Sequence, residues 1–521
     1  MPRFSNLRII KFCIFILLLF WFGTFLSHKI DLTTADLGRH IQNGNILVNG
    51  APEERTGILK TNFYSYTMPE REFVNHHWLS GVYYYLVQTT FGFVGQSVFY
   101  ILFALGSFIL FFDVARRKSN FWIALATSII VLPLIVKRAE VRPEVFTYFL
   151  TAAFFWLLST RTNIKNDKWL WALPFLMFLW VNLHIGFVFG FLVMGAFGLE
   201  QLILFVRKKP NYFPKLLLIS VLCLIAACIN PNFIAGLLYP LQIFKDYGYL
   251  IVENQSIGFL ENLNFTQGQH FVLYRIIVLL LGVCSVAAAF KNWRKINIPL
   301  LLLAIVGTYM AYKGIRNFPL FALFALPVIA YHLYILKPRQ MEIGTKQIIW
   351  TLGMVIVSFS LFLQNQERIS KKEALGLGLL PDINKSAEFV KQNKISGPIF
   401  NNYDTGGYLI YHLYPQKVFV DNRPEAYTTK FFQESYIQPQ EDDKKFRELD
   451  EKYKFNSIFF SHRDYTPWAQ EFLVRMTKDK AWAPVYVDDY NIIFLKRNSQ
   501  NSELIRKYEL PEDRFRITEN Q

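Results

Sequence analysis

The sequence has 521 residues, of which 53% are hydrophobic, 17% are aromatic and only 18% are charged. The surface of a soluble protein of this size needs more charge, so much of the apolar content has to face lipid. The formal net charge of +16 lies in short clusters between apolar segments, where it orients spans and meets anionic head groups. We therefore do not expect nucleic acid as a partner.

Apolar segments recur along the chain, and a helix that crosses a bilayer needs about 20 such residues. They cover residues 9–26, 93–112, 121–136, 145–158, 169–183, 187–205, 213–229, 271–290, 298–312, 318–336 and 348–363. This pattern predicts a mostly α-helical, multi-pass integral membrane protein with about eleven spans.

Basic clusters predict the orientation of these spans. The first segment follows Arg3, Arg8 and Lys11 and lacks a small-residue cleavage site, so we interpret it as a retained span with a cytoplasmic N-terminus. Alternation places each basic turn inside, provided that the aromatic stretch 78–92 forms an interfacial or re-entrant helix. An odd number of spans then places the chain after residue 363 outside.

The first outer loop, residues 28–77, carries the best candidates for chemistry. Asp36 is a carboxylate that can accept a proton from an attacking hydroxyl; Asp31 is the alternative, and either residue can instead cap a helix over 37–47. His76 and His77 complete an acid/base or metal site, or contact lipid head groups.

Later outer turns contain basic residues on the side where the positive-inside rule does not expect them. They are Lys137, Arg138, Arg142, Lys313 and Arg316. Such residues suit the phosphate of a lipid phosphate or diphosphate. The alternative is that Arg138, Glu140, Arg142 and Glu144 pair with one another, whereas Arg316 has no acid partner nearby in the sequence.

Several motifs together resemble a known superfamily. They are Asp31-x4-Asp36-Leu37-Gly38-Arg39-His40-Ile41, Phe63-Tyr64-Ser65-Tyr66-Thr67, Asn75-His76-His77-Trp78-Leu79, Trp180-Val181-Asn182-Leu183-His184, Asn230-Pro231 and Arg316-Asn317-x-Pro319-Leu320-Phe321. In these the membrane part resembles bacterial GT-C glycosyltransferases of the RgtA/B/C/D-like and protein-mannosyltransferase-like kinds. The resemblance implies a location in a bacterial plasma membrane.

The resemblance also implies an activity. A GT-C enzyme takes a sugar from a polyprenyl-phosphate carrier and passes it to a glycan, lipid or protein acceptor on the outer face of the cell envelope. Asp36 matches the acidic base of the first loop, which implies direct attack with inversion and no covalent intermediate. The implied substrate-binding residues are Arg39, His40, His76, His77, Arg138, Glu140, Arg142, His184, Lys313 and Arg316.

Two motifs of related enzymes are missing from the sequence. The first loop has no Asp-x-Asp pair, and the chain has no Trp-Trp-x-x-Asp acceptor motif of oligosaccharyltransferases. The sequence therefore leaves open both a protein acceptor and a divalent cation.

Charge density rises after residue 364, which predicts a small soluble α/β domain over 365–500 and a polar tail over 501–521. We expect strands at 398–401, 418–420 and 457–460, a final pair within 484–496, and a helix over 408–413. Asp421 and Arg423 bind a ligand or form a salt bridge within the domain. The segments 400–408 and 419–423 resemble the tail of the same bacterial family.

Two other classes of protein fit part of the pattern. A transporter or flippase also places charge in an outward cavity, but the chain shows no internal repeat and its polar residues concentrate on one side. A polysaccharide ligase or polymerase also handles lipid-linked glycans, and the loop 230–270 would then hold its key residues.

Overall fold

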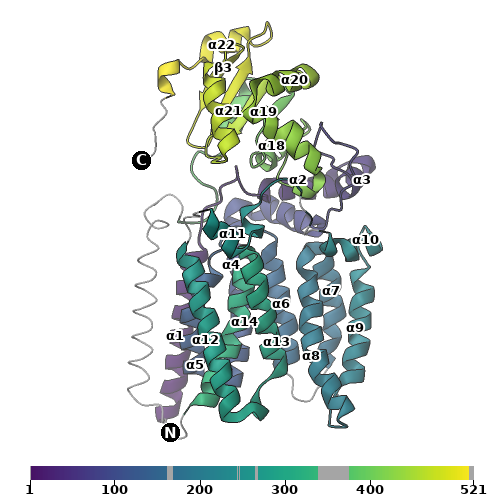
Figure 1. Ribbon diagram of the computed structural model, residues 1–521, viewed down its shortest axis with the longest axis vertical. Coiled ribbons are helices and arrows are strands. Elements are labelled where there is room, and N and C mark those ends of the chain that lie inside the picture. Colours follow the sequence, from purple (N-terminus) through teal and green to yellow (C-terminus); the bar gives the residue numbers. More distant parts are fainter. Residues whose placement is uncertain are drawn as a thin grey trace. The chain divides into compact units, whose positions relative to one another are not determined.

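The computed structural model describes residues 2–160, 168–242, 245, 247–263, 268–337 and 375–515. The chain forms two compact units, each assembled from separate parts of the sequence (Figure 1). Unit 1 consists of the described residues of 1–28, 97–237 and 251–377, and unit 2 consists of those of 29–96, 238–250 and 378–521.

Unit 1 is a bundle of apolar helices. Its long helices are α1 (Pro2–Leu26), the second part of α4 (Trp78–Lys118), α5 (Phe121–Ile135), α6 (Glu144–Thr160), α7 (Ala172–Leu183), α8 (Val188–Val206), α9 (Phe213–Ala227), α12 (Gly268–Asn292), α13 (Ile298–Lys313) and α14 (Phe318–Leu336). They confirm the first ten predicted apolar segments as helices, and the predicted segment 348–363 lies outside the described residues.

Short elements connect these helices. They are η2 (Lys168–Trp171), η3 (Ile185–Phe187), α10 (Phe233–Leu238), η5 (Val252–Asn254), α11 (Ile257–Asn262), η6 (Trp293–Lys295) and η7 (Ile315–Asn317). Asparagine caps begin two of the long helices: Asn120 accepts a bond from the Ile123 N–H, and Asn297 accepts one from the Leu300 N–H.

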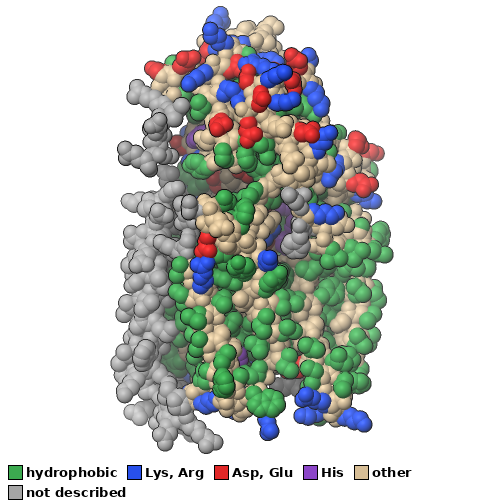
Figure 2. Space-filling model, viewed as in Figure 1, with side chains coloured by type: hydrophobic (Ala, Val, Ile, Leu, Met, Phe, Trp, Pro, Cys, Tyr) green, Lys and Arg blue, Asp and Glu red, His purple; other side chains and the backbone are tan. Residues whose placement is uncertain are grey.

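Helix α14 lies at the centre of the bundle, packed against α5, α12 and α13. Peripheral helices instead expose large apolar side chains, such as Phe20 on α1 and Phe290 on α12. Figure 2 shows hydrophobic side chains over the surface of the bundle. In water this surface would be unfavourable, and it is the surface that a helical protein presents to lipid. Five described helices are long and apolar enough to cross a membrane, and five more are shorter.

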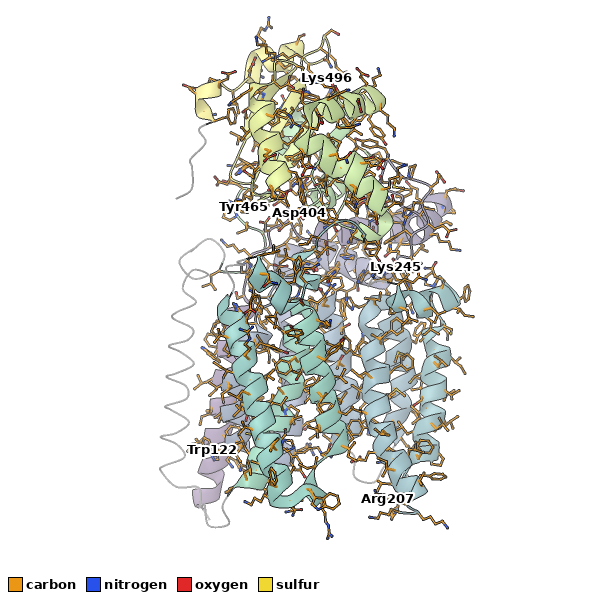
Figure 3. The ribbon with its side chains drawn as sticks, viewed as in Figure 1. Trp122, Arg207, Lys245, Asp404, Tyr465 and Lys496 are labelled. Carbon is orange, nitrogen blue, oxygen red and sulfur yellow. The ribbon has the colours of Figure 1, made fainter. Side chains whose placement is uncertain are left out.

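One end of the helix bundle gathers points that the alternation of spans assigns to the same side of the membrane. The N-terminus, the start of α5 at Trp122 and the end of α8 at Arg207 all lie at one end of unit 1 (Figures 1 and 3). These three points share one end of the bundle, the end that the sequence assigns to the cytoplasm, and the orientation itself stays a prediction.

Helix α4 is two helices joined at a break. Gly92 has φ 62° and ψ −164°, which lies outside the helical region and which residues with a side chain rarely adopt. The break separates residues 78–92 from the span that follows, and the interfacial or re-entrant position of this stretch stays a prediction.

Unit 2 contains the first loop and the C-terminal segment. Its elements are α2 (Leu37–Asn49), α3 (Pro52–Lys60), the first part of α4, η4 (Tyr239–Leu241), α17 (Lys385–Gln392), β1 (Ile399–Asn401), α18 (Gly406–Leu413), η8 (Pro424–Ala426), the π-helix η9 (Phe431–Ile437), α19 (Gln438–Glu441), α20 (Asp443–Tyr453), β2 (Ser457–Ser461), α21 (Pro467–Lys478), β3 (Trp482–Val487), β4 (Asn491–Lys496), α22 (Ser502–Tyr508) and η10 (Glu512–Arg514).

The four strands form one mixed sheet in the order β1-β2-β4-β3. Strand β1 runs parallel to β2, with Phe400 opposite Ile458, and the other two pairs are antiparallel. Three of the four predicted strand regions and the helix over 408–413 are confirmed. The prediction of a strand at 418–420 is corrected, because Val418 forms an isolated bridge with Ser65 and does not join the sheet.

That bridge belongs to a long contact between the first loop and the C-terminal segment. Tyr66 N–H donates to the Val418 carbonyl at 3.1 Å, and Val418 N–H donates to the Tyr64 carbonyl at 3.0 Å. The Tyr66 hydroxyl also donates to the Ile399 carbonyl at 2.8 Å. Phe73 of the loop is part of the aromatic core around Phe400. The two segments therefore fold as one body.

Candidate active site

Asp36 lies at the position that precedes α2, and its side chain makes no bond to the first turn of that helix. Asp31 has a different environment, because its Oδ1 accepts bonds from both the backbone N–H and the hydroxyl of Thr33. Of the two candidate carboxylates, Asp31 therefore stabilises its own turn. The predicted helix over 37–47 is confirmed as α2, and neither aspartate caps it through a side-chain bond to its first turn.

The side chain of Asn422 bridges Asp36 and Arg39. Asn422 Nδ2 donates to Asp36 Oδ1, and Arg39 Nε donates to Asn422 Oδ1 at 3.1 Å. Arg39 lies on the first turn of α2 and is only 5% exposed. A carboxylate and a guanidinium are thus held by the two ends of one amide.

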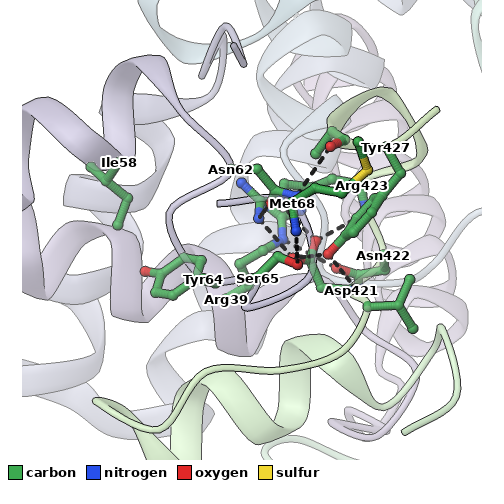
Figure 4. A network of polar contacts seen from close by, with 12 residues as sticks. Arg39, Ile58, Asn62, Tyr64, Ser65, Met68, Asp421, Asn422, Arg423 and Tyr427 are labelled. Carbon is green, nitrogen blue, oxygen red and sulfur yellow. Dashed lines mark hydrogen bonds and ion pairs between the residues drawn. The ribbon is translucent and has the colours of Figure 1, made fainter. Parts of the chain in front are cut away.

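The residues on either side of Asn422 form a buried ion pair (Figure 4). Arg423 Nε and Nη2 donate to the two oxygens of Asp421, each at 2.7 Å. Arg423 Nη2 also donates to Asn62 Oδ1 at 2.8 Å, and the Tyr427 hydroxyl donates to Asp421 Oδ2 at 3.1 Å. The salt bridge that the sequence allowed between Asp421 and Arg423 is present, and it fixes the backbone on both sides of Asn422.

The electrostatics of this cluster depend on burial and on its two arginines. Burial alone would raise the pKa of Asp421, but the Arg423 charge and its hydrogen bonds hold it below the ordinary value. Burial raises the pKa of the nearby Glu425 carboxyl, and the charges of Arg39 and Arg423 only partly offset that rise.

Glycines allow helix α18 to approach this cluster closely. A Cβ at position 406 would collide with the backbone of Asp421 and Val420, and a Cβ at position 407 would lie 3.2 Å from Asn422 Nδ2. The Gly406-Gly407 pair therefore explains why the chain can place Asn422 beside α2.

Three predicted histidines lie together on the same unit. The ring centroids of His76 and His77 are 3.9 Å apart, and those of His40 and His77 are 5.4 Å apart. His76 also packs against Tyr239. Within the ranges that the structure describes, no group of three or more His, Cys, Asp or Glu side chains is arranged to hold a metal ion, so we derive no step through a metal.

The predicted basic residues of unit 1 form a network with glutamates. Arg138 Nη2 lies 3.0 Å from Glu144 Oε1, and Arg138 Nη1 lies 2.7 Å from Glu253 Oε2. Arg316 Nη2 also lies 3.0 Å from Glu144 Oε1. As the sequence indicated, Arg316 has no acid partner close by in the chain; its partner Glu144 is 172 residues away in the sequence.

Of the two remaining basic residues, Arg142 contacts glutamates of the network and Lys313 does not belong to it. Arg142 Nε contacts Glu140 Oε2 at 2.7 Å, and Arg142 Nη1 contacts Glu253 Oε2 at 3.4 Å. Burial would raise the pKa of Glu253, but Arg142 and Arg138 lower it to about 2. Lys313 is exposed, with Nζ 5.9 Å from the Tyr309 ring centroid. We refer to Arg138, Glu140, Arg142, Glu144, Glu253 and Arg316 as the arginine–glutamate network.

His184 interacts electrostatically with Glu144 of this network, and its ring is held by contacts to Nδ1. The Gly186 N–H donates to His184 Nδ1 at 2.9 Å, and the Thr147 hydroxyl lies 2.7 Å from the same nitrogen. Because Nδ1 accepts a hydrogen bond from the backbone N–H, this nitrogen carries no proton, and the neutral ring has its proton on Nε2. The Trp180 indole N–H in turn donates to Thr147 at 3.1 Å, which links two residues of the Trp180–His184 motif.

The sequence did not predict the roles of some residues in these clusters. Asn422 and Asn62 act as amide bridges in unit 2, and Glu253, which the sequence places on the outer face, binds arginines in unit 1 together with Asn254. Asn422 lies inside the Asp421-Asn422-Arg423 motif, which was a usable signal. The other three had no signal beyond a polar residue in an outer turn.

No model of a protein family and no curated protein sequence matches this chain. Solved structures do. The oligosaccharyltransferase AglB from Archaeoglobus fulgidus, in complex with an inhibitory peptide and a dolichol-phosphate, aligns over 91% of this chain and 71% of its own, with TM-score 0.53 and 10% identity. The Archaeoglobus fulgidus oligosaccharyltransferase in its apo form gives TM-score 0.53 and 10% identity over 86% of this chain and 67% of its own.

ArnT from Cupriavidus metallidurans, in the apo state, aligns over 97% of this chain and 99% of its own, with TM-score 0.54 and 13% identity. AglB and ArnT are both GT-C membrane glycosyltransferases. At sequence identities of 10% and 13%, the similarity to these two enzymes is a similarity of fold. The protein is a mostly α-helical polytopic membrane protein with a GT-C-like fold and a small mixed α/β region towards its C-terminus.

Proposed function

We propose that this protein is a glycosyltransferase that moves a sugar from a polyprenyl-phosphate carrier to an acceptor hydroxyl on the outer face of a bacterial plasma membrane. The observation that carries the proposal is a carboxylate, Asp36, held at the start of α2 in a GT-C-like fold. One structural neighbour, AglB, was solved with a dolichol-phosphate, a lipid phosphate of the kind that we propose as the sugar carrier.

In the proposed reaction Asp36 accepts the proton of the acceptor hydroxyl. The acceptor oxygen forms a bond to the anomeric carbon while the bond from that carbon to the phosphate oxygen breaks, and the electron pair leaves with the lipid phosphate. This is one displacement at one carbon, so the anomeric configuration inverts. The leaving group is already a stable anion, and no side chain has to protonate it.

A separate part of the proposal concerns unit 1. All three arginines of the network contact glutamates, but the side chains of Arg138 and Arg142 are 12% and 19% exposed, whereas Arg316 is 36% exposed and Lys313 is exposed. We assign Arg316 and Lys313 to binding of the lipid phosphate, with the rest of the arginine–glutamate network holding Arg316 in place.

The experiment that tests this function uses the full-length protein in proteoliposomes with a panel of polyprenyl-phosphate-linked sugars. We expect release of polyprenyl phosphate that depends on an acceptor, and a product of inverted anomeric configuration by NMR. Retention of configuration would contradict the direct displacement. Transport of the intact lipid-linked sugar across the membrane without its cleavage would instead favour a flippase.

A further inference from the structure

We propose that Asn422 is a positioning residue for Asp36, so that the C-terminal segment supplies a working part of the active site. The inference rests on the proposed function, because it assumes that Asp36 is the base. Asn422 and Asp36 are 386 residues apart in the sequence, and both belong to unit 2.

The chemistry of the two partners defines the orientation of the Asn422 amide. A carboxylate only accepts hydrogen bonds and a guanidinium only donates them. The amide therefore has to direct its Nδ2 towards Asp36 and its Oδ1 towards Arg39, as the contacts have it. Among neutral side chains of this length, an amide is the one that offers a donor and an acceptor at separate atoms.

The backbone around Asn422 is held firmly enough for such a role. The Asp421–Arg423 pair is buried, and Arg423 is bound by Asn62 from the first loop. On the other side, the bare surface of Gly407 faces the Asn422 amide. A positioning side chain is effective when its own surroundings fix its geometry, and here the ion pair and helix α18 do so.

The consequence for Asp36 is specific. A hydrogen bond donated to the ionised carboxylate stabilises that form, so Asn422 favours an Asp36 that is ready to accept a proton. The same bond fixes the direction of the carboxylate oxygens relative to α2. Loss of Asn422 should therefore shift the pH at which Asp36 titrates, in addition to any effect on the stability of the protein.

The test follows the Asp36 carboxyl directly in the full-length, detergent-solubilised protein. Infrared difference spectra recorded against Asp36→Asn isolate the Asp36 carbonyl band, and its titration is compared among variants. Asn422→Ala removes the donor and should move the titration midpoint up by about one pH unit. Asn422→Asp keeps the shape of the side chain, but adds a like charge, and should move the midpoint further in the same direction.

The matched control is Asn456→Ala. Asn456 is also a buried amide bridge in unit 2: it donates to the Ser396 carbonyl at 2.9 Å and accepts from Asn501 at 2.9 Å. We expect lower stability in this variant and an unchanged Asp36 titration. If Asn422→Ala does not fold, Asn422→Asp alone carries the comparison.

The outcomes separate this inference from the function on which it rests. The same Asp36 midpoint in wild type and both Asn422 variants would overturn the positioning role, whatever the enzyme's activity. With a donor that supports turnover, the acid limb of the pH–rate profile should move with the infrared midpoint. An unchanged turnover in Asp36→Asn would instead overturn the assignment of the base, and the infrared shifts would still report whether Asn422 acts on that carboxyl.

Discussion

Asp421 and Arg423 are joined by two parallel hydrogen bonds of 2.7 Å, and their side chains are 0% and 3% exposed. Removal of one member of such a pair leaves an uncompensated buried charge, which costs about 3–5 kcal/mol. We expect Arg423→Met to lower the free energy of unfolding of unit 2 by that amount, as measured by thermal unfolding in detergent. The double variant Asp421→Leu, Arg423→Met should recover part of the loss, and an unchanged melting temperature in the single variant would contradict the structure.

The same pair makes unit 2 sensitive to acid. The pKa of Asp421 is lower in the folded protein than its ordinary value of 3.8, so its stabilising contribution is present above that value and is lost as the pH falls below it. The melting temperature of the wild type should therefore fall more steeply below about pH 4 than that of the double variant Asp421→Leu, Arg423→Met. Parallel curves would argue against the ion pair.

Glu425 should have the opposite dependence. The pKa of Glu425 in the folded protein is raised above the ordinary value of 4.5. The neutral carboxyl therefore contributes to the stability of the fold below pH 4.5, and this contribution is lost as the pH rises through the folded pKa. Glu425→Gln keeps a neutral side chain at every pH. We expect this variant to be more stable than wild type at pH 8 and nearly equal to it at pH 4, which melting curves at the two pH values will determine.

Gly406→Ala tests the close approach of α18 to the Asp421 backbone. The added methyl group has no room there, so we expect a loss of stability of at least about 1–3 kcal/mol. Gly195→Ala on α8 is the control, because nothing lies within 4 Å of the position of its Cβ. Equal melting temperatures for the two variants would show that α18 does not approach Asp421 this closely.

The role of Arg316 and Lys313 can be measured through binding alone. We expect Arg316→Ala and Lys313→Ala each to weaken binding of a polyprenyl phosphate by roughly tenfold, which corresponds to about 1.4 kcal/mol. Arg275→Ala removes an exposed ion pair of unit 1 with Glu261 and should leave the affinity unchanged. Equal affinities for all three variants and wild type would remove Arg316 and Lys313 from the proposed phosphate site.

The sequence predicted most of the local structure because local signals determine it. Apolar length defined the first ten predicted spans, and the alternation of basic clusters separated residues 78–92 from the span that follows within α4. The alternation of strands and amphipathic helices predicted five strands in this region, and four of them form the sheet. The segment 418–420 was assigned wrongly as a strand of that sheet because an apolar triplet does not reveal its partner, and Val418 bridges Ser65 of the first loop.

The candidate site was harder to predict, since its contacts join residues far apart in the chain. Asp36 stood out as an outer-loop carboxylate, but nothing near it in the sequence indicates that Asn422 binds it. In the same way, Arg316 showed no partner until the fold placed Glu144 and Asn254 beside it. Arg316 and Glu144 are 172 residues apart in the sequence, so their ion pair depends on how the helices pack and cannot be predicted from a local sequence pattern.

The most direct test of the account compares two carboxylates of the first loop. Asp36→Asn and Asp31→Asn each remove one negative charge, and Asp31 is engaged by Thr33 in its own turn. The measurement is acceptor-dependent release of polyprenyl phosphate from a lipid-linked sugar by proteins that fold equally well. The account predicts that Asp36→Asn lowers the rate by about 10²–10⁴-fold while Asp31→Asn keeps most of it. A wild-type rate in Asp36→Asn would contradict the account.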